Sequence, residues 1–176
     1  MNYIINSPGE EEISFQANEI IVSKTDKSGK LVYANDVFCR VAEMSTREVI
    51  GKPHNIIRHP DMPRAIFNLL WDTISAGDEI FAYVKNRSKT GKYYWVIAHV
   101  TPSFDSNGQI DGYHSTRRAP KKTALEKVVP LYQELRDVEL KHENKREGLD
   151  ESLSLLQQKL AKADMTYSEF VWSLGN

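Results

Sequence analysis

The sequence predicts an α+β fold: a five-stranded antiparallel sheet with short helices on one face, followed by a C-terminal α-helical extension. Two observations support this prediction. Strand-type runs rich in β-branched and aromatic residues stand on both sides of a region whose apolar residues recur at helical spacing. Beyond residue 119 the apolar residues again recur every three or four positions. We therefore divide the chain into an N-terminal arm (1–18), a folded domain (19–119) and the helical extension (120–176).

The domain is predicted to open with a β-hairpin. Residues 19–25 and 30–34 have strand-type composition, and a glycine-containing turn separates them. Asn35 follows directly, and because asparagine is a favoured N-cap, we expect a helix to begin there. Ser45 and Glu48 have the spacing of a capping box, which predicts a second short helix.

A longer helix and three strands complete the domain. From Pro63 to Gly77 apolar residues repeat at helical spacing, with a proline at the start and a glycine at the end. The remaining strands are predicted at residues 79–86, 92–103 and 109–117. Side-chain alternation sorts the middle strand into one face with Tyr94, Val96, Ala98 and Val100 and another with Tyr93, Trp95, Ile97 and His99.

Residues 53–63 (PHNIIRHPDMP) are the most unusual segment of the chain. Three prolines argue against a long helix or a central strand, and they lower the entropy that this loop loses when it binds a ligand. The polar groups of this loop are two histidines, an arginine and an aspartate, and they suit an anionic ligand with a polar ring edge. A polar surface loop ahead of a helix is the alternative.

The extension is predicted to be helical, with a kink or a restart at Pro130. Its later part carries a narrow apolar seam made of Leu149, Leu153, Leu156, Leu160 and Ala163. This seam is short for a free-standing coiled coil, so it needs a partner: the preceding helix folded back around Gly148, or a second subunit. Short connections favour the hairpin, and we expect a homodimer to form elsewhere on the sheet.

The composition argues against several classes of protein. Apolar residues make up 40% and charged residues 27% of the chain, and no apolar run approaches the length of a membrane span. The formal net charge is −1 with interleaved signs, so nucleic acid is a poor candidate partner. The lone Cys39 and the lack of a signal-peptide pattern lead us to expect a cytoplasmic protein. Nucleophile, phosphate-loop and zinc motifs are absent from the sequence, so we do not expect an enzyme.

One resemblance is carried by the hexapeptide RHPDMP (58–63), which GKPHN precedes and a helix ending in Leu70 and Trp71 follows. KNR at 85–87, YWV at 94–96, GY at 112–113 and PLY at 130–132 extend it. With these motifs the chain resembles the PAS domains of bacterial aerotaxis receptors, which are flavin-binding redox sensors. The resemblance runs from about residue 34 to residue 132.

The resemblance implies a PAS fold for residues 19–119 and noncovalently bound FAD. Arg58, His59 and Asp61 match family positions that are implicated in FAD binding. A guanidinium suits this task because it meets phosphate oxygens two at a time. Asn35 and Trp71 match further cofactor positions, although a helix cap and a core residue explain them equally well.

Flavin-binding PAS domains in general imply further contacts. Asn86 stands five residues before the hairpin glycine, where relatives bond the edge of the flavin ring. His114 stands where light-sensing relatives carry a glutamine, and His54 belongs to the matched segment. By the same analogy the strand face with Tyr94 lines the pocket, and the N-terminal arm or a second subunit covers the other face.

We therefore expect a cytoplasmic redox or oxygen sensor for aerotaxis or a similar signal transduction system, which relays the state of FAD to a signalling protein in another chain. One alternative is a haem-binding gas sensor with His54, His59 or His114 as axial ligand. Another is a cofactor-free interaction module built on the helical extension. The cysteinyl adduct of light, oxygen or voltage domains is excluded, because residues 55–58 contain no cysteine.

Overall fold

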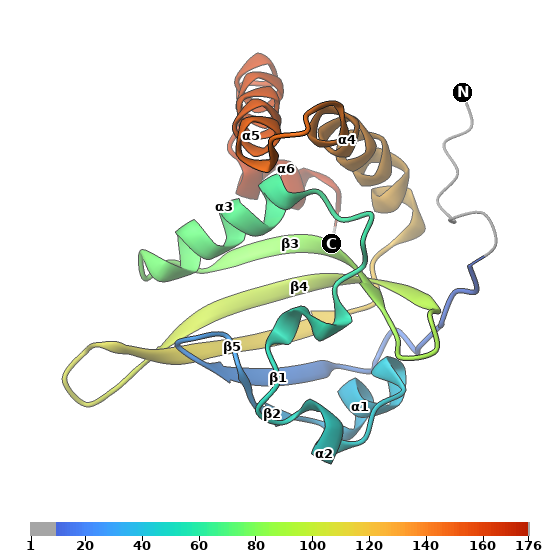
Figure 1. The fold of residues 1–176 in the computed structure, drawn as a ribbon, viewed down its shortest axis with the longest axis vertical. Coiled ribbons are helices and arrows are strands. Elements are labelled where there is room, and N and C mark those ends of the chain that lie inside the picture. Colours follow the sequence, from blue (N-terminus) through green and yellow to red (C-terminus); the bar gives the residue numbers. More distant parts are fainter. Residues whose placement is uncertain (1–9, 176) are drawn as a thin grey trace.

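The computed structural model describes residues 10–175 and contains a five-stranded antiparallel sheet (Figure 1). The strands are β1 (Ile21–Asp26), β2 (Leu31–Ala34), β3 (Ile80–Arg87), β4 (Tyr93–Phe104) and β5 (Ile110–Arg118). They are ordered β2-β1-β5-β4-β3, so that β2 and β3 form the edges of the sheet. The predicted fold class is confirmed, and every strand begins and ends within two residues of its expected bounds. The first half of the predicted arm, residues 1–9, lies outside the described residues.

Strand register gives the sheet two distinct faces. Ala98 on β4 pairs with Ala82 on β3 and with Arg117 on β5, and these three residues point to what we call the inner face. Their neighbours in sequence point to the opposite, outer face. Lys85 and Trp95 are paired there, for example.

The inner face is covered by the helices between β2 and β3. These are α1 (Asp36–Ala42), α2 (Thr46–Val49), the 3-10 helix η1 (His54–Ile57) and α3 (Arg64–Ser75). Two of them begin where the sequence predicts, because Asn35 accepts a hydrogen bond from the Phe38 N–H at 3.0 Å and Ser45 forms a capping box with Glu48. In Figure 1, α1 and α2 lie near the β2 edge and α3 lies on the β3 side.

The outer face is covered by the N-terminal segment and by two helices of the extension, α4 (Lys122–Lys141) and α6 (Tyr167–Ser173). Tyr93 at the start of β4 exchanges backbone hydrogen bonds with Glu11 and Ile13. Tyr132 on α4 lies against Trp95, with ring centres 6.2 Å apart, and donates a hydrogen bond to the Tyr83 carbonyl at 2.8 Å. The extension therefore packs on the sheet beside the edge strand β3.

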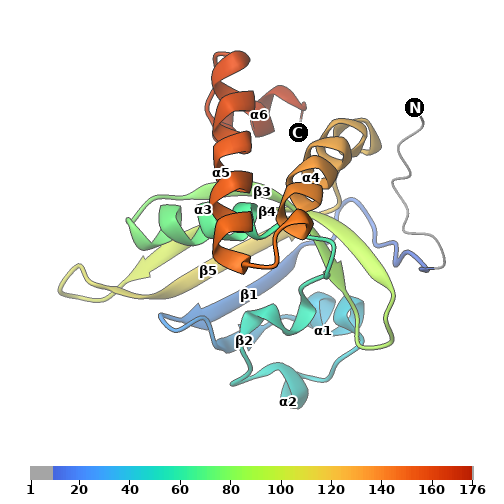
Figure 2. The same cartoon turned by 45° about the horizontal axis from the view of Figure 1, so that its top comes forward.

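Helices α4 and α5 (Lys145–Lys162) form an antiparallel hairpin, as the short connection predicts (Figure 2). The expected hinge at Gly148 is wrong, because this glycine lies inside α5. A Cβ at Gly148 would lie 2.9 Å from the Glu139 carbonyl oxygen, so glycine permits the close approach of the two helices. The buried residues of α5 are Gly148, Ser152 and Leu156 rather than the full leucine seam.

Pro130 does not interrupt α4, although a kink or restart was expected there. The helix continues through the proline, and its apolar side packs on both sides of it: Val128 and Tyr132 are buried. Packing therefore outweighs the single backbone hydrogen bond that proline removes. No helix within residues 10–175 combines the length and the apolar content that a membrane crossing requires.

A buried carboxylate on α4 joins the extension to the domain. Glu139 is 5% exposed and accepts hydrogen bonds from the backbone N–H groups of Arg64 and Ala65, each at 2.9 Å. It also accepts one from Arg64 Nε at 3.1 Å. The first N–H groups of a helix have no partner within the helix, so Glu139 caps α3 from another helix and places a negative charge at its positive end.

We predict that Glu139→Ala destabilises the protein, because two buried N–H groups at the start of α3 lose their acceptor. Hydrogen bonds to a charged group contribute about 1.5 to 3 kcal/mol, and we expect the free energy of unfolding in urea to fall by at least that amount. Glu126→Ala is the matched control, since Glu126 is an exposed glutamate on the same helix. Equal stability of the two variants would contradict the capping role.

Candidate functional site

A cavity of about 260 Å³ lies between the inner face of the sheet and the segment that runs from η1 to α3. Its volume is close to the lower limit of about 300 Å³ for ligand-binding pockets. Apolar residues of α3 form one wall. Polar and charged residues around it include Ser23, Thr25, His54, Asn55, Arg58, Asn86, Ser115 and Arg117. Two of these residues are arginines, whereas no carboxylate of residues 10–175 lines the cavity.

Four buried polar atoms around this cavity lack a hydrogen-bond partner in the described part of the chain. They are Thr25 Oγ1, Asn86 Nδ2, Ser115 Oγ and Arg117 Nη1. Nearly all buried polar groups of folded proteins are hydrogen bonded, so a cluster of exceptions calls for a partner from outside the described chain, such as water, an ion or a ligand. The amide and guanidinium nitrogens are donors only, so this partner must present acceptors.

Arg117 is held in place through Nη2, the second terminal nitrogen of its guanidinium. It is 3% exposed, and Nη2 donates hydrogen bonds to Ser23 Oγ and to His54 Nε2, both at 2.6 Å. Burial and the neighbouring positive charge lower the pKa of His54 to about 3, so the imidazole is neutral and its Nε2 is an acceptor. Burial also lowers the pKa of Arg117 to about 10, which leaves the guanidinium charged at neutral pH.

Arg58 and Trp71 also line the cavity. The Arg58 guanidinium lies 4.0 Å from the centre of the Phe67 ring, and Nη2 donates a hydrogen bond to the Met62 carbonyl at 3.4 Å. Trp71 is 39% exposed and meets the Tyr113 ring edge-on, with ring centres 5.4 Å apart. Both side chains thus line the cavity and are also partly exposed on the outside of the protein.

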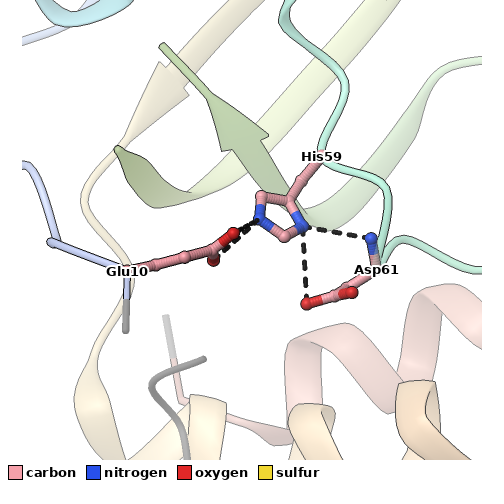
Figure 3. A group of neighbouring side chains, drawn as sticks. All are labelled: Glu10, His59 and Asp61. Atoms are coloured by element: carbon pink, nitrogen blue, oxygen red, sulfur yellow. Dashed lines mark hydrogen bonds and ion pairs between the residues drawn. The ribbon is translucent and has the colours of Figure 1, made fainter. Parts of the chain in front are cut away.

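His59 points away from the cavity, although it follows Arg58 directly. Its side chain is 1% exposed, and Nε2 lies 3.0 Å from the Glu10 carboxylate (Figure 3). Nδ1 accepts a hydrogen bond from the Asp61 N–H at 3.0 Å, so Nε2 carries the ring proton and donates a hydrogen bond to the Glu10 carboxylate. Burial, and then the charge of Lys85, lower the pKa of His59. His59 and Asp61 therefore do not line the cavity, and their predicted contact with the cofactor stays a prediction.

Glu10, His59 and Asp61 offer ligand atoms that lie within 4.8 Å of one another, as in a metal site. Basic side chains already balance the charge of these carboxylates, however. Lys85 Nζ lies 3.1 Å from Asp61 and 3.5 Å from Glu10, and Arg136 on α4 lies 3.8 Å from Asp61. We call these five residues the outer ionic cluster. It joins the N-terminal segment, the proline-rich loop, β3 and α4.

Two other predicted residues also lie outside the cavity. Asn35 caps α1, accepts a hydrogen bond from the Val22 N–H at 3.0 Å and donates one to the Ile20 carbonyl at 2.8 Å. These bonds occupy its amide in joining α1 to β1. His114 pairs with Lys24 and Thr101 on the outer face, so alternation directs it away from the cavity.

The sequence analysis missed the polar residues that β1 and β5 contribute to the cavity. The alternation that we applied to β4 also applies to β5, where it puts Tyr113, Ser115 and Arg117 on one face. An arginine on the buried face of a strand was the available signal. The structure thus brings His54, Arg58, Trp71 and Asn86 of the predicted set together with these residues.

Comparison with known proteins agrees with this architecture. Residues 31–117 match the family model described as PAS fold. The aerotaxis receptor of Escherichia coli (strain K12) is 40% identical over 115 residues, which are 65% of this chain and 22% of the receptor. The chain therefore spans about a fifth of the length of this relative.

Solved structures share the fold at low sequence identity. The light state of the blue-light photoreceptor Aureochrome1 LOV has a TM-score of 0.56 and 22% identity, covering 62% of this chain and 88% of that chain. A light-oxygen-voltage domain studied with a flavin analogue has a TM-score of 0.55 and 17% identity, covering 63% of this chain and 83% of that chain. The family match, together with the strand order and the identity to the aerotaxis receptor, shows that residues 31–117 of this chain belong to the PAS domain family.

Proposed function

We propose that this PAS domain is a redox sensor that binds FAD noncovalently and relays the state of the flavin to another protein chain. The observation that carries the proposal is the pair of unpartnered donors, Asn86 Nδ2 and Arg117 Nη1, in a cavity that no carboxylate of residues 10–175 lines. The edge of a flavin ring presents carbonyl oxygens and ring nitrogens, which accept hydrogen bonds from such donors. The identity to an aerotaxis receptor and the fold shared with a domain that was studied with a flavin analogue support the same ligand.

Different residues of the chain bind different parts of the proposed flavin. A flavin, when bound, supplies reversible electron transfer, and the protein orients it and excludes water. Asn86 and Arg117 orient the ring edge, while Trp71 and the apolar residues of α3 cover the ring. A volume of about 260 Å³ suits a ring system better than a whole dinucleotide, and the partly exposed Arg58 is the residue that would hold the phosphates of FAD as their counter-ion.

Haem is a poorer candidate because the cavity offers no free axial ligand. His54 is the histidine of residues 10–175 that lines it, and its Nε2 already accepts a hydrogen bond from Arg117 and lies 3.2 Å from Ser23 Oγ. The absorption spectrum of the purified protein distinguishes the candidates. Flavin bands support the proposal, whereas a haem Soret band or a spectrum without cofactor bands contradicts it.

The route from the ligand to a partner begins with two pairs of neighbouring residues. Arg58 and Asn86 line the cavity, whereas His59 and Lys85, which adjoin them in sequence, belong to the outer ionic cluster. A shift of either cavity residue moves its neighbour, and with it the contacts to Glu10 and to α4. We propose that the output is read from this surface by a signalling protein in another chain, and that the sensor works as a homodimer.

We predict that Arg58→Ala gives a folded protein with weakened flavin binding. The loss of a charge-assisted hydrogen bond of about 1.5 to 3 kcal/mol weakens affinity at least tenfold. The ratio of flavin to protein absorbance, followed by titration of the flavin-free protein with FAD, measures this effect. Arg47→Ala is the control, because Arg47 is exposed on α2 and does not line the cavity. Full occupancy in both variants would refute the role of Arg58.

We predict that Trp71→Ala weakens flavin binding but costs little stability. A fully buried tryptophan contributes roughly 3 to 5 kcal/mol, and Trp71 is 39% exposed, so the flavin-free variant should lose much less. Ile66→Ala on the same helix is the comparison, because Ile66 is 1% exposed and its truncation costs about 2 to 5 kcal/mol. Unfolding of the flavin-free Trp71→Ala protein would instead assign Trp71 to the core.

A further inference from the structure

The charges around the cavity are not balanced within the described chain. Arg58 and Arg117 line it, and none of the carboxylates of residues 10–175 does. Arg58 is partly exposed and has the face of Phe67 as a partner. Arg117 is 3% exposed, and no ion pair within the described residues includes it. A buried guanidinium without a counter-ion is costly, so the imbalance centres on Arg117.

The groups that surround Arg117 do not neutralise its charge. His54 and Ser23 are neutral acceptors for Nη2, and the Phe38 ring centre lies 5.5 Å away. The Tyr94 hydroxyl is the acidic group that acts on the pKa of Arg117, and burial raises the pKa of this hydroxyl above its ordinary value, so it stays protonated. Nη1 has no acceptor among residues 10–175. The guanidinium is thus fixed through Nη2, and its Nη1 is left without an acceptor within residues 10–175.

We infer that Arg117 is the counter-ion for a negative charge on the ligand, in an anion subsite that Ser23 and His54 position. This inference rests on the proposed function and states which redox form of the flavin the cavity prefers. An oxidised flavin that gains two electrons and one proton becomes an anion, and a second proton makes it neutral. A guanidinium beside the ring supplies the opposite charge in place of that second proton. The electrons come from an external low-potential reductant, which is dithionite in the test below.

The inference has two consequences that can be measured on the flavin-loaded protein. Stabilising the reduced anion raises the reduction potential, and a tenfold preference corresponds to about 30 mV for a two-electron couple. The uptake of one proton per two electrons also makes the potential fall by about 30 mV per pH unit, whereas the uptake of two protons doubles that slope.

The experiment compares the parent with Arg117→Met and Arg117→Lys in spectroscopic redox titrations at several pH values. Arg118→Met is the control, because Arg118 is the next residue on β5 and is exposed. We expect Arg117→Met to lower the reduction potential of the flavin by at least about 30 mV and to double the change of this potential per pH unit. We expect Arg117→Lys to have a potential and a pH dependence close to those of the parent. Parent-like potential and slope in Arg117→Met would overturn the inference.

If Arg117→Met no longer binds flavin, the melting temperature of the flavin-free protein tests the inference instead. Removal of an unpaired buried charge stabilises the flavin-free protein, and His54 keeps the Ser23 hydroxyl at 3.2 Å as a hydrogen-bond donor. We therefore expect flavin-free Arg117→Met to melt at a higher temperature than the flavin-free parent. A lower melting temperature would show that Arg117 is structural and would overturn the inference. If the parent itself shows no flavin bands, the proposed function fails, and the melting comparison still tests the unpaired charge.

Discussion

The structure depends on the alternation of side chains along β3 and β5. In these strands one residue lines the cavity and the next belongs to the outer face: Asn86 follows Lys85, and Arg118 follows Arg117. A single layer of backbone therefore separates the cavity from the groups that hold the N-terminal segment and the extension. The proposed sensor function uses this arrangement, because a change on the cavity face has only this layer to cross before it reaches the outer face.

Local signals explain why so much of the fold could be predicted from the sequence. The strands, the Asn35 cap and the capping box of Ser45 and Glu48 depend on residues within a few positions of one another. The placement of His59 and Asp61 depends on Lys85 and Glu10, which are distant in sequence, so the composition of the loop does not reveal that both residues belong to the outer ionic cluster.

Two further differences have equally specific causes. His114 was assigned by analogy with a family position, whereas alternation along β5 identifies Ser115 and Arg117 as the cavity residues. Gly148 was read as a flexible hinge, but it is a contact glycine at which α5 meets the Glu139 carbonyl. In both cases the local pattern identifies the strand or helix, whereas the contact that decides the residue's role comes from a part of the chain that the pattern does not include.

The cap that Glu139 provides for α3 bears on the order in which the chain folds. The acceptor for the first N–H groups of this helix lies 75 residues further along the chain, in a segment that leaves the ribosome much later. Until that segment has been made and has docked, the start of α3 has only water as a partner, and the wall of the cavity that α3 forms lacks its final support. The wall of the cavity that α3 forms therefore gains its final support only after α4 has been made and has packed against the sheet.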